Sequence, residues 1–203
     1  MPLTELTTLN HVPPNNFESL SRLYTSWCSL QPSYSAYPLT FYADVRHPGV
    51  IYLLTGWRNA QERKLWCQSD EYQDVLADMV ERVEVKRSLV LNMDFDTIPR
   101  AARGLMCVHT IRIEGDEEKE DEGIPWMPSN DSFLEVLWTA CTEDCEDAST
   151  FCRFTLYGTI VSDETVRRKY RLGSNSFTAM KRVAVPVDKT SMLHASKDII
   201  SCT

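Results

Sequence analysis

Apolar and polar side chains alternate along several segments of the first hundred residues, which predicts β-strands. Residues 39–45 alternate strictly, and residues 50–57 are again extended, β-branched and aromatic. The turn residues His47-Pro48-Gly49 between them predict a hairpin. In all, the pattern predicts strands at residues 3–10, 39–45, 50–57 and 88–96.

Between these strands the apolar residues recur every three or four positions, which predicts helices. The first helix begins at Asn15 or Asn16 and ends before Pro32. A second helical region follows two N-cap residues, Asn59 and Ser69, and we expect it to break near Gln68. The first half therefore has the predicted order β-α-β-β-α-β, with the helices packed on the sheet.

The pattern restarts after Pro99 in a weaker form. We expect a degenerate second unit of the same kind over residues 104–187, an acidic linker at residues 116–122 and a loosely held tail over residues 188–203. The elements predicted in this half are strands at 106–113, 151–161 and 177–187, a helix capped by Asp131 that runs through Leu137, Trp138 and Cys141, and a short polar helix between Asp163 and Tyr170.

Charge and composition narrow the class of protein. The chain of 203 residues has a formal net charge of −8 and 43% hydrophobic residues. It can therefore bury a core, and we expect no nucleic-acid or membrane partner because an acidic surface repels phosphate. Seven irregularly spaced cysteines, no apolar run of about 18 residues and no basic, apolar N-terminus predict a cytoplasmic protein with free thiols.

Motifs for cofactors and metals are absent from the sequence. It contains no GxGxxG, Walker A, GxSxG or HExxH motif. Its four histidines have no metal-ligand spacing, and Cys141 and Cys145 lack a nearby histidine. We therefore predict neither a metal nor a cofactor.

Three stretches of the first half carry a family resemblance. They are the strand Ile51–Trp57, the capped helix that contains Trp66, and the run Ser69-Asp70-Glu71-Tyr72-Gln73 before an apolar helix. In these features residues 1–98 resemble the antibiotic biosynthesis monooxygenase-like branch of the dimeric α+β barrel superfamily. The resemblance implies a ferredoxin-like unit whose sheet closes a barrel with another copy, in cis or in trans, and a ligand cleft between sheet and helices. It also implies a homodimer.

Members of that superfamily include cofactor-independent monooxygenases, polyketide cyclases, haem-degrading enzymes and units without known chemistry. Cofactor-free chemistry needs a base and a hydrogen-bond donor. Our candidate catalytic residues are His109 and His11, each in or beside a strand, and Tyr42 and Asp94, each on a polar strand face. The alternatives are a core histidine bonded to backbone for His109, a surface-loop histidine for His11, and an exposed sheet face for Tyr42 and Asp94.

Aromatic residues are the candidates for the wall of the cleft, although core packing accounts for each of them too. They are Tyr24, Trp27, Trp57, Trp66, Tyr72, Phe95 and Trp126. The leading functional hypothesis is a cofactor-independent tailoring enzyme of secondary metabolism that cyclises or rearranges a polyketide-like molecule by acid/base catalysis. The alternatives are a cofactor-independent monooxygenase of a phenolic substrate and a non-catalytic binding or dimerisation module.

Overall fold

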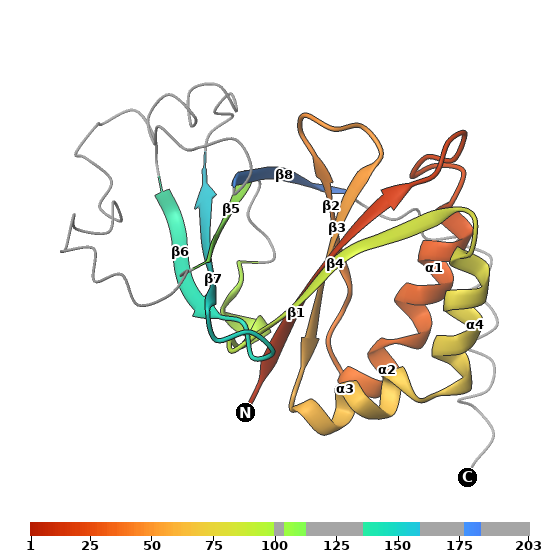
Figure 1. The fold of residues 1–203 in the computed structure, drawn as a ribbon, viewed down its shortest axis with the longest axis horizontal. Helices are drawn as coiled ribbons and strands as arrows, with labels where there is room; N and C mark the ends of the chain where they lie inside the picture. The colour runs from red at the N-terminus through yellow and green to blue at the C-terminus, as the bar shows by residue number, and fades with distance from the viewer. Residues whose placement is uncertain (100–103, 113–135, 159–176, 184–203) are drawn as a thin grey trace, which may run out of the picture.

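The computed structural model describes residues 1–99, 104–112, 136–158 and 177–183. Within these residues the chain is an α+β protein in which four helices pack on one side of a long antiparallel sheet (Figure 1). The elements are β1 (Leu3–His11), α1 (Ser21–Leu30), α2 (Pro32–Ser35), β2 (Thr40–Asp44), β3 (Val50–Trp57), α3 (Ala60–Cys67), α4 (Asp70–Met79), β4 (Val83–Leu91), the 3-10 helix η1 (Phe95–Thr97), β5 (Leu105–Arg112), β6 (Val136–Glu143), β7 (Thr150–Tyr157) and β8 (Phe177–Val183).

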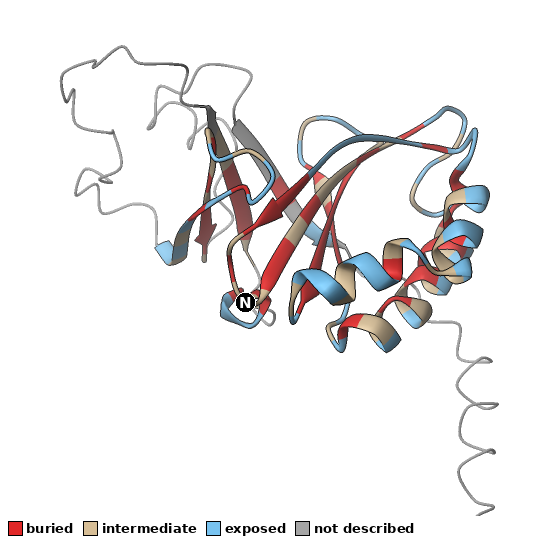
Figure 2. Cartoon of the chain, turned by 60° about the horizontal axis from the view of Figure 1, so that its bottom comes forward, coloured by how far each residue is buried: buried red, intermediate tan, exposed pale blue. Residues whose placement is uncertain are grey.

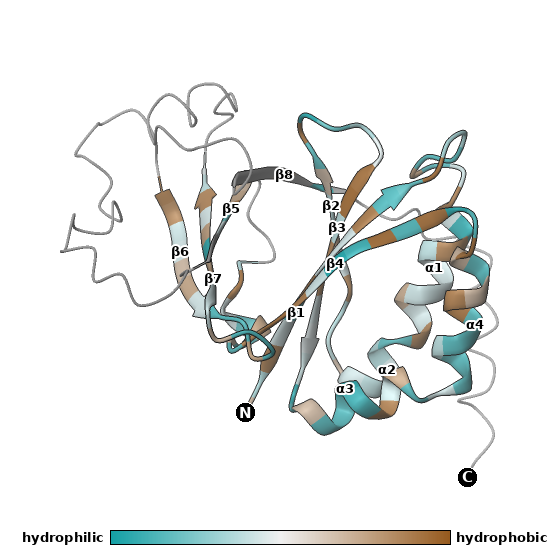
Figure 3. Ribbon diagram, viewed as in Figure 1, coloured by the Kyte–Doolittle hydropathy of each residue, from teal (hydrophilic) through white to brown (hydrophobic). Residues whose placement is uncertain are grey.

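The first half has the predicted β-α-β-β-α-β order, and its strands lie in the order β4-β1-β3-β2. Both predicted N-caps are formed: the Asn59 side chain accepts the backbone N–H of Glu62, and the Ser69 hydroxyl accepts that of Tyr72. The second helical region is divided at Gln68 as expected, because α3 ends at Cys67 and α4 begins at Asp70. In Figure 3 the outward sides of α3 and α4 are largely hydrophilic.

The second half repeats the strand order of the first. Its strands lie in the order β8-β5-β7-β6, and β8 pairs with β2, so the eight strands form one sheet. The two ends of that sheet meet where β4 and β6 finish: Leu91 bridges Asp144, and the backbone N–H of Asn92 donates to the carbonyl of Glu143 at 3.1 Å. The sheet thus closes on itself at this end, within a single chain.

Two apolar cores lie on opposite faces of the first four strands (Figure 2). The outer core lies between the sheet and the helices and includes Tyr24, Phe41 and Trp57. The inner core lies between the two halves, where Leu54 and Phe95 of the first half cluster with residues of the second. Because β-strand side chains alternate between faces, each strand of the first half supplies both cores. The partners from the second half are Met106, Val108, Cys152, Phe154, Leu156 and Met180.

Two predicted elements are wrong. The fourth strand spans Val83–Leu91 instead of residues 88–96, because Glu81 adopts a positive φ of 66° just after α4 and the chain then pairs with β1. The segment expected to be a helix through Leu137 and Trp138 is instead β6 from Val136 onward. Trp138 and Ala140, two positions apart, both pack against the inner core. The segment therefore follows the two-residue repeat of a strand and not the 3.6-residue repeat of a helix.

Several predictions lie outside the described residues: the acidic linker, the Asp131 cap, the polar helix after Asp163, Trp126 and the tail. In the described part of the chain, Cys28, Cys67, Cys107, Cys141, Cys145 and Cys152 form no disulfide. No helix among the described residues has the length and apolar character that a membrane span requires.

Candidate functional site

A cavity of about 150 Å³ lies between the helices and the sheet of the first half. Trp27 of α1, Trp66 of α3, Tyr72 of α4 and Trp57 of β3 line it, so aromatic rings come from four different elements. Its apolar lining is completed by Leu53, Leu76, Met79 and Val85. Because Val85 and Ser88 of β4 line the cavity and are themselves exposed, it reaches solvent along that strand.

Strand register places polar side chains on the sheet side of this cavity. Glu5 of β1 lies opposite Thr55 of β3 and Val90 of β4, and Thr7 lies opposite Leu53 and Ser88. Alternating residues share a face, so Glu5 and Thr7 point to the helices together with Leu3 and Leu9 of the outer core. The apolar alternation of β1 is thus interrupted by polar residues beneath the helices.

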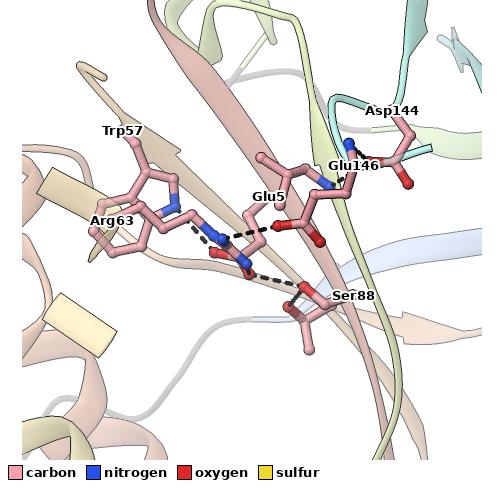
Figure 4. Close-up of polar contacts among 8 residues, drawn as sticks. Glu5, Trp57, Arg63, Ser88, Asp144 and Glu146 are labelled. Carbon is pink, nitrogen blue, oxygen red and sulfur yellow. Dashed lines mark hydrogen bonds and ion pairs between the residues drawn. The ribbon is translucent and has the colours of Figure 1, made fainter. Parts of the chain in front are cut away.

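Glu5 is the centre of a hydrogen-bonded cluster (Figure 4). One carboxylate oxygen accepts the indole N–H of Trp57 at 3.1 Å. The other accepts the guanidinium Nη2 of Arg63 at 3.0 Å and the hydroxyl of Ser88 at 2.8 Å. Charge-assisted bonds of this kind fix the carboxylate of Glu5 in position and orientation at the edge of the cavity.

Arg63 connects the cavity to the second half of the chain. Its Nη1 donates to the Glu146 carboxylate at 3.1 Å, and Glu146 lies in the hairpin between β6 and β7 (Figure 4). Burial acts to lower the pKa of Arg63, but the bonds to Glu5 and the field of both carboxylates outweigh burial and raise it. Arg63 is therefore a permanent cation shared between two carboxylates.

Two polar groups beside the cavity have no partner. Gln31 is 1% exposed, and neither its amide nitrogen nor its amide oxygen has a hydrogen-bond partner. The Nε of Arg63 is also buried without one. Buried polar groups are nearly always hydrogen-bonded, so these atoms are exceptions to the usual pattern.

The remaining titratable side chains at the cavity are held neutral. Burial raises the pKa of the Tyr72 hydroxyl, and nearby Cys67 and Glu5 add to this effect. Burial likewise raises the pKa of the Cys67 thiol. Both groups are thus uncharged near neutral pH, and among the described lining residues Glu5 and Arg63 carry the charge.

The structure brings four of the predicted aromatic residues together at this cavity, namely Trp27, Trp57, Trp66 and Tyr72. Tyr24 belongs to the same outer core but does not line the cavity. Phe95 lies on the other face of the sheet, in the inner core, where it packs edge to face with Tyr37. It reaches that place because Gly56 has no side chain: a Cβ there would lie 2.6 Å from that of Phe95.

None of the four predicted catalytic residues lines the cavity. His11 is buried at the end of β1, where its Nε2 is 2.6 Å from the hydroxyl of Tyr24. Burial lowers the pKa of His11 and raises that of Tyr24, so both are neutral. The alternative of a surface histidine is therefore wrong for His11, which is 4% exposed and paired with a side chain.

Tyr42, Asp94 and His109 lie on different elements: β2, the turn before η1, and β5. Tyr42 is buried in the inner core, and burial raises its pKa. Asp94 lies in a turn instead of a strand, and its side chain caps η1 by accepting the N–H of Asp96 at 2.9 Å. His109 lies on β5 opposite Arg153; burial and that arginine lower its pKa. Tyr42 lies on β2 and Asp94 follows β4, and these two strands are not neighbours in the sheet.

Sequence reasoning missed the polar residues Glu5, Arg63 and Gln31. Glu5 carried a usable signal, since a carboxylate on the apolar face of a strand needs a buried partner. Arg63 and Gln31 gave none, because the first lies in a polar helix and the second at a helix end before Pro32. In the described residues no three His, Cys, Asp or Glu side chains group as metal ligands.

No protein-family model matches this chain, and no curated protein matches it. Solved structures share its fold. A protein of Fusobacterium nucleatum subsp. nucleatum assigned as a monooxygenase aligns with a TM-score of 0.58 and 13% identity, over 90% of this chain and 93% of that one. A protein assigned as a chlorite dismutase aligns with a TM-score of 0.57 and 14% identity, over 95% of this chain and 98% of that one.

The chlorite dismutase of Candidatus Nitrospira defluvii aligns with a TM-score of 0.52 and 10% identity, over 96% of this chain and 95% of that one. Each of these alignments covers nearly all of both chains, so the likeness extends over both halves. Identities of this size establish architecture and leave chemistry open. The expectation is confirmed for the fold: this chain has an α+β barrel architecture built from two ferredoxin-like strand orders, as the structural neighbours do.

Proposed function

We propose that this chain is a cofactor-independent enzyme that binds a mostly apolar, ring-containing small molecule in the aromatic cavity and oxygenates it. The observation that carries the proposal is the aromatic wall of Trp27, Trp57, Trp66 and Tyr72 beside the charged pair Glu5 and Arg63. Flat aromatic walls favour ring-shaped ligands, and a few oriented polar groups set the reacting position. Fold neighbours assigned as monooxygenases support oxygenation over the cyclisation that the sequence alone favoured.

The cavity residues have complementary parts in such a reaction. Glu5 takes a proton from an acidic C–H of the substrate, and Arg63 stabilises the resulting anion. The anion gives an electron to O₂, and the two radicals combine to a peroxide anion. Glu5 returns its proton to that anion, and the resulting hydroperoxide loses water. A CH₂ group becomes a carbonyl, one oxygen atom enters the product and the other leaves as water. Cyclisation would begin with the same proton transfer and need no oxygen.

Oxygen consumption and intrinsic tryptophan fluorescence test the proposal together, with the two-ring compounds 2-tetralone and 1-naphthol as probes. We expect quenching of the cavity tryptophans and enzyme-dependent oxygen uptake with at least one probe. Glu5→Gln should retain quenching and lose at least tenfold in oxygen uptake, whereas Glu84→Gln, in an exposed pair with Lys86, should change neither. If neither probe quenches the fluorescence, the proposal fails.

A second candidate is binding without catalysis. The specific observation in its favour is that Glu5 already accepts three hydrogen bonds, so most of its lone pairs are engaged before any ligand binds. Under this alternative the probes quench fluorescence, but neither oxygen uptake nor a rearranged product appears, and Glu5→Gln affects affinity alone.

A further inference from the structure

The mouth of the cavity lies beside β4, and apolar side chains flank it. Val85 lines the cavity and is 49% exposed, so a ligand in the mouth can reach it. Leu76 of α4 also lines the cavity and is partly buried. Only residues 80–82 separate α4 from β4, so the two elements flank one opening (Figure 1). The proposed chemistry uses neither of these side chains.

A β-bulge in β4 gives the mouth its apolar character. Leu9 of β1 pairs with Val85, whereas the residue before Leu9 pairs with Arg87. Lys86 is therefore an extra residue with no pairing partner on β1. With regular pairing, Lys86 would lie opposite Leu9 and point to the helices, because a slip of one residue exchanges the two faces of a strand. The bulge instead directs Val85 to the cavity, and Lys86 is not part of the cavity lining.

The polar groups at the mouth are already engaged with one another. The hydroxyls of Thr7 and Ser88 lie 3.2 Å apart, and Ser88 donates to Glu5 at 2.8 Å. The ammonium of Lys86 pairs with the carboxylate of Glu84 at 2.6 Å. A part of the ligand that extends through the mouth would meet no unpaired charge among these residues. It would contact the apolar side chains of α4 and β4.

We propose that the ligand is a ring compound with an apolar alkyl chain, whose ring fills the cavity and whose chain leaves through the mouth over Val85 and Leu76. This inference names the ligand class of the proposed function and rests on it. The cavity of about 150 Å³ accommodates one or two rings, since an engineered apolar cavity of about that size binds benzene. A chain on such a ring must therefore extend through the mouth, where each methylene that leaves water adds to the affinity.

The test measures the affinities of 4-ethylphenol, 4-butylphenol and 4-hexylphenol for the full chain by calorimetry and tryptophan fluorescence. A fully buried methylene raises affinity about fourfold, so a half-exposed one should raise it about twofold. For the wild type we therefore expect a gain of about tenfold or more from the ethyl to the hexyl compound. In Val85→Asp this gain should fall below about threefold, while 4-ethylphenol still binds about as tightly as to the wild type.

Val80→Asp is the matched control. Val80 is 63% exposed at the end of α4 and is not among the residues that line the cavity. This variant should keep the full gain with chain length. A gain that persists in Val85→Asp, or that Val80→Asp removes equally, would mean that the chain binds elsewhere and would overturn the inference. Melting temperatures show that each variant is folded.

The failures of the two proposals can be told apart. If 1-naphthol quenches the fluorescence but chain length does not change the affinity of the phenols, the proposed function survives and the alkyl-chain class is rejected. If no ring compound binds, both proposals fail.

Discussion

Arg63 is the residue on which the polar side of the cavity depends. It is three-quarters buried, and its guanidinium bonds to Glu5 at 3.0 Å and to Glu146 at 3.1 Å. Removal of one partner from such a pair leaves the other charge in a poorly solvated place. Removing one partner of this ion pair should therefore lower the free energy of unfolding by more than the pair contributes when intact.

Replacing Arg63 with Met should accordingly destabilise the fold by about 2 kcal/mol, less than for a fully buried pair because Arg63 is partly solvated. Arg58→Met is the matched control, since Arg58 is mostly exposed and bonds to Glu62 on the same helix segment. That variant should lose under about 0.5 kcal/mol. Urea unfolding measures both, and equal losses would show that burial of the pair is unimportant.

His11 makes stability depend on pH. Burial lowers its pKa in the folded chain below the ordinary value of about 6.5, so between these two pKa values the unfolded chain binds more protons. The free energy of unfolding should then fall as pH drops from about 7, by up to about 1.4 kcal/mol per pH unit for this group. Unfolding at pH 7.5, 6.5 and 5.5 measures the slope.

In His11→Phe that slope should decrease, whereas the hydroxyl of Tyr24 loses its partner at every pH. An unchanged slope would mean that other groups, such as His109 with its lowered pKa, account for the pH dependence. The absolute stability of the variant is not the diagnostic quantity, because losing the hydrogen bond affects it at all pH values.

At the scale of elements, the β6–β7 hairpin holds the barrel closed. Asp144, which is 6% exposed, accepts the backbone N–H of Val90 in β4 and that of Glu146 in its own hairpin. Asp144→Ala should therefore leave two backbone donors without their acceptor and cost about 1–3 kcal/mol. The exposed neighbour Glu143→Ala is the control, and hydrogen exchange at Val90 should rise in the first variant alone.

Elements that could be predicted from sequence are those whose local pattern and tertiary environment agree. The hairpin of β2 and β3 and the capped helices α3 and α4 lie where alternation, turn residues and caps indicated. Prediction failed where two periods fit the same residues, as in β6, and where a positive φ at Glu81 ended a helix early. The aromatic wall of the cavity could be predicted because aromatic residues occur in the segments that were expected to pack between helices and sheet.

The polar site could not be predicted in the same way. The bond between Glu5 and Arg63 joins β1 to α3 across 58 positions of sequence, and Glu146 adds a residue from the other half. Such contacts depend on strand order and on how far a long side chain reaches, neither of which one sequence displays. His109 and Asp94 were chosen for their residue type, and type alone does not bring side chains together.

At the scale of the whole molecule, the inner core joins two halves with the same strand order. Residues 1–98 alone would expose Leu6, Leu54 and Phe95 of that core. An apolar sheet face of this kind needs a cover, and a second copy of the same fragment offers one by the same strand order. We expect a 1–98 fragment to form a dimer, which analytical ultracentrifugation would detect.

A folded, monomeric fragment would contradict this expectation. The full chain covers the same face internally, so an exposed sheet face no longer argues for the homodimer expected from the sequence, which stays a prediction. Sedimentation of the full chain beside the fragment separates the two cases.

The repeated strand order within one chain also bears on how this protein can change over evolution. In a barrel made of two identical chains, every substitution appears on both outer faces at once. Here β1 carries Glu5 and Thr7 on its helix-facing side, whereas β5, in the equivalent place of the second half, carries Cys107 and His109. Substitutions in one half can therefore create or remove a ligand-binding site on that half alone, while the other half continues to supply the barrel wall.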